Sequence, residues 1–101
     1  GGSYSEMESA GILMPLTETH AKYFAGLTYE EEAIVTCRLT EMGVSKCKFE
    51  YEVIRKSDNK LMTTGYTKHG FVDQNFKPIN LKKKAYDMWA KLDSLLWEEE
   101  S

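Results

Sequence analysis

The chain has 101 residues, 42% hydrophobic and 29% charged, with a formal net charge of -3, which fits one small domain over residues 1–101. The net negative charge excludes an overall attraction for nucleic acid or an anionic membrane, and no apolar run approaches the roughly 20 residues that cross a bilayer. Because no signal-peptide pattern opens the chain, we expect a soluble, cytoplasmic protein without nucleic-acid or membrane partners.

The first residues predict a short helix followed by an irregular strand. Ser3, with a glutamate three residues later, has capping-box spacing, and Gly11 supplies a left-handed stop, so residues 4–10 are expected to be helical. The strand-like segment 12–24 contains Pro15, which removes a donor from the hydrogen-bond ladder. This favours an edge strand or a bulge.

Alternating apolar and polar residues predict two further strands, at residues 31–42 and 45–56. A three-residue loop with Gly43 in the left-handed conformation would keep both apolar sets on one sheet face. In that register Cys37 lies opposite Phe49.

The two cysteines, Cys37 and Cys47, are expected to be reduced and to act as small hydrophobic residues. They would be diagonal neighbours rather than an opposed pair, which argues against a disulfide. Together with His20 and His69 they do not have the ligand spacing of a compact zinc finger. We expect no metal site.

After a polar turn, residues 61–72 predict a fourth strand, and residues 81–97 predict a terminal helix. Gly65 inside the strand indicates a bulge, or a close approach by another backbone or a ligand. Asn80 has the position of an N-cap. The expected fold class is α+β: an antiparallel curved sheet of about four strands with a C-terminal helix.

Three stretches then combine: "GILMPLTETHAKYFAGLTYEEE", "SKCKFEYEVIRKSDNKLMTTGYTKHGFVD" and "FKPINLKKKAYDMW". In this order the chain resembles the hot-dog-fold acyl-CoA thioesterases of the 4-hydroxybenzoyl-CoA thioesterase type, from about Tyr4 to Trp89. The resemblance implies hydrolysis of a coenzyme A (CoA) thioester, which is the substrate, without a further cofactor. The alternatives are a non-catalytic hot-dog derivative that binds an acyl or CoA ligand or only itself, and an unrelated cystatin-like interaction module.

The family places its catalytic Asp in an N-terminal segment that is followed by a long central helix. "SYSEMESAGI" resembles the segment just after that helix, so we expect a truncated hot-dog domain, either a fragment or a natural short form, and we name no catalytic residue. The apolar sheet face would then lack its cover. The C-terminal helix folded back, the same helix from a partner chain, or a second sheet could cover it. We expect a homodimer or homotetramer.

The family tends to hold the CoA phosphates with basic side chains at the start of the "SKCKFEY" strand and in the loop before the last helix. The resemblance therefore implies CoA-binding roles for Lys46, Lys48 and Lys77. Lysine binds a phosphate as a point charge, without the fork of arginine. The alternative is that these are ordinary solvated lysines. His20 and His69 are expected to be structural.

Overall fold

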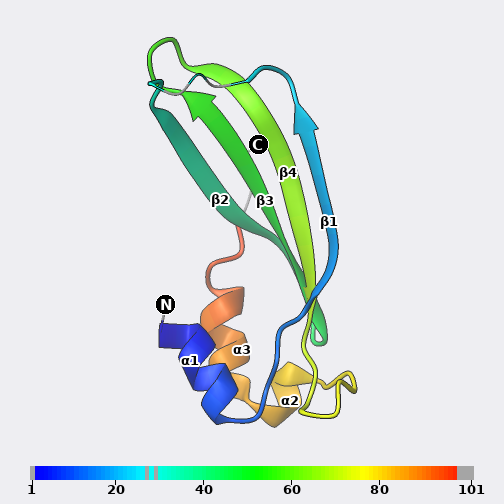
Figure 1. Ribbon diagram of the computed structural model, residues 1–101. Coiled ribbons are helices and arrows are strands. Elements are labelled where there is room, and N and C mark those ends of the chain that lie inside the picture. The colour runs from blue at the N-terminus through cyan, green and yellow to red at the C-terminus, as the bar shows by residue number, and fades with distance from the viewer. Residues whose placement is uncertain (1, 27, 29, 98–101) are drawn as a thin grey trace.

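A computed structural model, which describes residues 2–26, 28 and 30–97, shows one antiparallel sheet with a group of short helices at one end of it (Figure 1). The strand order is β1-β4-β3-β2, and all neighbouring strands are antiparallel. The sheet is long and curved, so the predicted α+β architecture is confirmed. The elements are α1 (Gly2–Ser9), β1 (Leu16–Tyr23), β2 (Ala33–Met42), β3 (Lys46–Arg55), β4 (Lys60–Gly70), α2 (Leu81–Lys84) and α3 (Tyr86–Asp93).

Strand β1 lies at one edge of the sheet, as Pro15 predicted, and its pairing with β4 is irregular between Leu16 and Glu18. A Cβ atom at Gly65 of β4 would lie only 2.8 Å from the carbonyl oxygen of His20 in β1. Gly65 is therefore explained by the close approach of another backbone, one of the two reasons predicted for it.

The β2–β3 hairpin keeps its apolar residues on one face, as predicted, but the register that we expected is wrong. Cys37 lies opposite Tyr51, because the hairpin closes with Met42 opposite Cys47. The extra residue between Leu39 and Glu41 of β2 then keeps the apolar residues of both strands on one face. The loop then runs over residues 43–45. The φ angle of Gly43 is not positive, so the left-handed glycine was also wrong.

The side chains of the sheet alternate between two faces of opposite character. The paired residues of the four strands assign each side chain to a face. The face we call apolar carries, among others, Val35, Cys37, Leu39, Cys47, Phe49, Tyr51, Val53, Thr67 and His69. The face we call polar carries, among others, Glu18, His20, Arg38, Glu41, Lys48, Glu50, Tyr66 and Lys68. His69, whose face the sequence left open, lies on the apolar side.

Helices lie near both ends of the described part of the chain, but not with the expected boundaries. Ser3 lies inside α1 rather than before it, whereas Gly11 has the predicted left-handed conformation, with φ of 77°. The single helix expected over residues 81–97 is two helices, because Ala85 has φ of -146° and interrupts the helical backbone. Asn80 is the predicted N-cap, and its side chain accepts a hydrogen bond from the backbone N–H of Lys83 at 3.1 Å.

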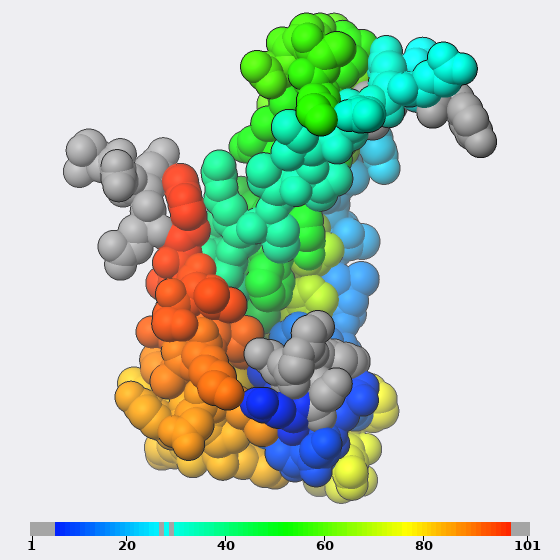
Figure 2. Space-filling model, turned by 90° about the vertical axis from the view of Figure 1, so that its left-hand side faces the viewer, coloured from blue at the N-terminus to red at the C-terminus, as the bar shows by residue number. Residues whose placement is uncertain are grey.

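The main buried core lies at one end of the molecule, where the helices meet the sheet. Its buried members are Met7, Ile12, Leu39, Cys47, Phe71, Leu81 and Leu92. The helices cover only this end of the apolar face, and Figure 2 shows the sheet extending beyond them. Val35, further along the same face, is 64% exposed. The C-terminal helices therefore cover the apolar face only in part.

Candidate functional site

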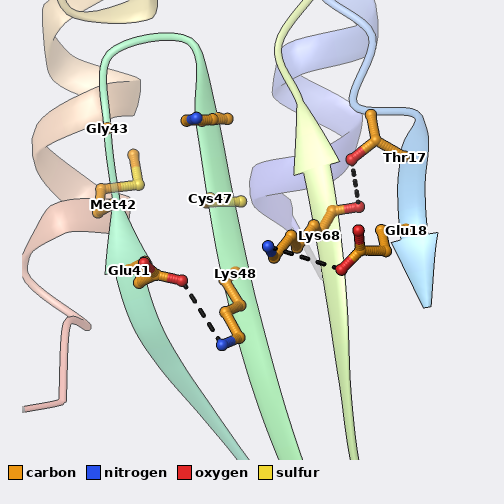
Figure 3. Close-up of a pocket in the computed structure, with 9 residues that line it drawn as sticks. Thr17, Glu18, Glu41, Met42, Gly43, Cys47, Lys48 and Lys68 are labelled. Carbon is orange, nitrogen blue, oxygen red and sulfur yellow. Dashed lines mark hydrogen bonds and ion pairs between the residues drawn. The ribbon is translucent and has the colours of Figure 1, made fainter. Parts of the chain in front are cut away.

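The polar face carries a cleft beside the β2–β3 hairpin, with a volume of about 540 Å³ (Figure 3). Three lysines on two strands contribute to it, and we call it the lysine cleft. It is lined by Thr17, Glu18, Glu41, Met42, Gly43, Lys46, Cys47, Lys48 and Lys68.

Four of these charged residues form one row across the sheet, because Glu18 pairs with Lys68, Lys68 with Lys48, and Lys48 with Glu41. The irregularity in β2 brings Glu41 into this row. Lys68 Nζ lies 3.6 Å from Glu18 Oε2, and Lys48 Nζ lies 3.6 Å from Glu41 Oε2. Within the part of the chain that the structure describes, Lys46 has no ion-pair partner. The cleft therefore has three cations and two anions.

Tyr66 contacts two of the charged residues in this row, Glu18 and Lys48. Its hydroxyl donates a hydrogen bond of 2.6 Å to Glu18 Oε2, and the ammonium of Lys48 lies 4.7 Å from the centre of its ring. The hydrogen bond from Tyr66, and then the positive charge of Lys68, hold the pKa of Glu18 below its usual range. Glu18 is therefore a fixed negative charge, and an anion that reaches Lys68 has to compete with it.

The structure brings together two of the three lysines that the sequence predicted. Lys46 and Lys48 line the cleft, whereas Lys77 lies in the loop before α2 and is not among the lining residues. Sequence reasoning missed Lys68. The sheet face on which Lys68 lies could be assigned only from the β3–β4 register, and this register places Lys68 beside Lys48.

The other candidate residues, the two histidines and the two cysteines, either do not line the cleft or, like Cys47, are unreactive there. His20 stacks on the Tyr66 ring, with 5.4 Å between the ring centres. Both cysteines are free, and burial raises the pKa of the Cys47 thiol to about 11. Among residues 2–26, 28 and 30–97, no group of three His, Cys, Asp or Glu side chains could hold a metal ion. No helix in the described ranges is long and apolar enough to cross a membrane.

Comparison with known proteins gives consistent matches. The model of the thioesterase-like superfamily matches residues 1–91. YneP of Bacillus subtilis (strain 168), provisionally named an acyl-CoA thioesterase, is 30% identical over 90 residues, which cover 88% of this chain and 64% of YneP. These matches confirm the resemblance to hot-dog thioesterases and leave the cystatin-like alternative without support.

Solved structures share the fold. The DHNA-CoA thioesterase of Staphylococcus aureus superposes with a TM-score of 0.80 at 28% identity, covering 90% of this chain and 60% of that one. A second S. aureus protein, SAV2348, was solved in complex with CoA. It has a TM-score of 0.77 at 14% identity, with 99% of this chain and 67% of that chain covered, and it shows the fold alone.

Proposed function

The chain belongs to the thioesterase-like superfamily, and on that premise we propose that it binds an acyl-CoA and takes part in hydrolysis of the thioester. The observation that carries the proposal is the convergence of Lys46, Lys48 and Lys68 in one cleft. The names of the similar proteins, an acyl-CoA thioesterase and a DHNA-CoA thioesterase, support a CoA thioester as the substrate.

The lysine cleft suits the phosphate groups of CoA rather than its apolar parts. The chain as a whole is negative, so an excess of positive charge at one cleft is a local attraction for an anion. The side chain of Lys48 is 24% exposed and that of Lys68 is 45% exposed. These side chains are therefore partly buried but still accessible, which favours charge-assisted hydrogen bonds to phosphate oxygens.

Calorimetry with CoA tests the binding step. Simultaneous Lys46→Ala and Lys48→Ala substitution is expected to weaken binding at least about tenfold, because hydrogen bonds to charged groups are lost. Lys56→Ala is the matched control, since Lys56 follows β3 at the opposite end of that strand, where it pairs with Glu32. An unchanged CoA affinity in the double variant would remove the proposal.

Two of the lysines need separate variants. Lys68→Ala is expected to weaken CoA binding, and raised salt is expected to weaken it further, because the contact is electrostatic. The CoA-binding role of Lys77 remains a prediction from the resemblance. CoA binding by Lys77→Ala measures whether the loop before α2 also contacts the ligand.

In the hydrolysis step, water adds to the thioester carbon, the carbon–sulfur bond breaks, and a carboxylic acid and the CoA thiol are released. Assays with several acyl-CoAs distinguish this activity from the alternative, a non-catalytic hot-dog derivative. Release of free thiol above the uncatalysed rate supports the hydrolase. CoA binding without release of thiol supports the alternative.

We also propose that the chain self-associates. Its accessible surface of 7161 Å² exceeds the roughly 5,800 Å² expected for a compact monomer of this mass. Its radius of gyration is 16.0 Å, against about 13 Å for a compact 100-residue domain. The excess surface, about 1,300 Å², is larger than the roughly 800 Å² that each partner buries in a standard interface. Sedimentation showing only a compact monomer would contradict self-association.

A further inference from the structure

The end of the molecule that carries the loop before α2 and the C-terminal helices is positively charged, although the chain as a whole is negative (Figure 1). Residues 73–91 contain five lysines and two aspartates, which gives a net charge of +3, so the rest of the chain carries -6. The total of -3, from which we expected no membrane partner, does not reveal this asymmetry. The basic end would attract an anionic surface.

Three of these lysines form most of the short helix α2. Lys82, Lys83 and Lys84 are all exposed, and none of them makes an ion pair with another residue that the structure describes. Because a helical turn holds about 3.6 residues, the three side chains spread around one turn, and their like charges repel one another. The stability of α2 does not explain this run of lysines, whereas a negatively charged partner would.

An exposed aromatic ring lies in the loop before these lysines. Phe76 is 68% exposed, and its φ angle of 61° is in the left-handed region, which is unfavourable for a bulky side chain. Asp73 fixes the loop, because its Oδ1 accepts hydrogen bonds from the backbone N–H of Asn75 at 2.8 Å and of Lys77 at 3.1 Å. Its carbonyl oxygen accepts one from the N–H of Phe76 at 3.0 Å. The loop therefore holds an apolar ring in water at a conformational cost, which points to a function for the ring.

The loop and α2 lie side by side. Lys84 lines one hollow together with the loop residues Asp73, Gln74 and Asn75. Because this hollow is lined mainly by polar side chains, it does not suit the apolar face of a partner helix. An exposed ring on a tight loop, with cations beside it, instead suits the boundary between the headgroups and the acyl chains of a lipid bilayer.

We propose that Phe76, Lys77, Lys82, Lys83 and Lys84 form a surface that binds anionic lipid membranes, and we call it the lipid surface. The Phe76 ring enters the headgroup boundary, and the lysines contact the lipid phosphates. In this arrangement the chain lies on the membrane and does not cross it.

The lipid surface does not overlap with the other proposed interactions. Self-association would cover the apolar face around Val35, beyond the end of the sheet that the helices cover. The lysine cleft is lined by other lysines, and the test below contains no CoA. The inference and the proposed function can therefore fail independently.

Co-sedimentation of the whole chain with lipid vesicles tests the proposal. Wild type is expected to bind vesicles in which roughly a quarter of the phosphatidylcholine is replaced by phosphatidylserine, and to bind pure phosphatidylcholine at least about tenfold more weakly. Raised salt is expected to weaken binding to the anionic vesicles. Simultaneous Lys82→Gln, Lys83→Gln and Lys84→Gln substitution is expected to weaken it about a hundredfold, since each lysine near the membrane contributes about fivefold.

The matched control for this charge change is the triple variant Lys22→Gln, Lys56→Gln and Lys60→Gln. It changes the net charge of the chain equally, but its three residues lie towards the opposite end of the sheet. Its binding to the anionic vesicles is expected to stay close to that of wild type. An equal loss of binding in the two triple variants would contradict the proposal.

The ring has its own variant. Phe76→Asn removes the ring but suits the left-handed backbone, and it is expected to weaken binding to the anionic vesicles about tenfold. Phe24→Asn is the control, because Phe24 is 51% exposed and follows β1 at the far end of the sheet. The proposal is overturned by the same affinity in Phe76→Asn as in wild type, by equal binding to neutral and anionic vesicles, or by no binding to anionic vesicles at low salt. The last result would favour an acidic protein as the partner of this surface.

Discussion

Replacing Gly65 with alanine tests the packing of β1 on β4. The new Cβ would lie 2.8 Å from the backbone oxygen of His20, so β1 or β4 must move. Overpacking of this kind costs about 1–3 kcal/mol. Loss of the glycine restricts the unfolded chain and returns about 0.4–1 kcal/mol. We therefore expect the free energy of unfolding to fall by about 1–2 kcal/mol.

Urea unfolding followed by circular dichroism measures this change, and the melting temperature is expected to drop by about 4–8 °C for each kcal/mol. Gly70→Ala is the matched control at the end of the same strand. Its Cβ would meet its nearest atoms at 3.7 and 3.9 Å, which is ordinary contact. Equal stability of Gly65→Ala and Gly70→Ala would refute the reasoning.

Three further predictions concern single side chains. Cys37 is exposed and Cys47 is buried, so a thiol reagent at pH 8 is expected to modify Cys37 rapidly and Cys47 only on unfolding; equal rates would contradict this. Asn80→Ala is expected to cost about 1 kcal/mol in urea unfolding, because the cap of α2 is lost; no change would contradict the cap. Hydrogen bonds from the backbone N–H groups of Lys77 and then Asn75 hold the pKa of Asp73 below its usual range. Its contribution to stability is therefore expected to be present above about pH 4 and to be lost as the pH falls through the folded pKa. Carbon-13 NMR that places this pKa at the unfolded value would contradict it.

The local features that the sequence predicted are those decided by neighbouring residues. Alternation along β2 and β3 assigned their apolar residues to one face, and Pro15 and Asn80 identified an edge strand and a helix cap. Each depends on a short-range property: the pleat, a missing donor, or a side-chain acceptor.

Other features depend on contacts between distant segments. Neither the closing pair of the β2–β3 hairpin nor the extra residue in β2 follows a local signal, so the register of Cys37 was wrong. The break at Ala85 could not be predicted either, because alanine is the best helix former and gives no local signal for an interruption. For the candidate site, Lys46 and Lys48 could be placed by resemblance, whereas Lys68 required the β3–β4 register.

The central claim is that the lysine cleft binds the phosphate groups of CoA. The most direct measurement is a titration of the isotope-labelled chain with CoA, followed by NMR of the backbone amides. We expect the largest shift changes at the amides of Gly43, Lys46, Lys48 and Lys68, which line the cleft. Changes confined to the apolar face, or no changes at saturating CoA, would contradict the claim.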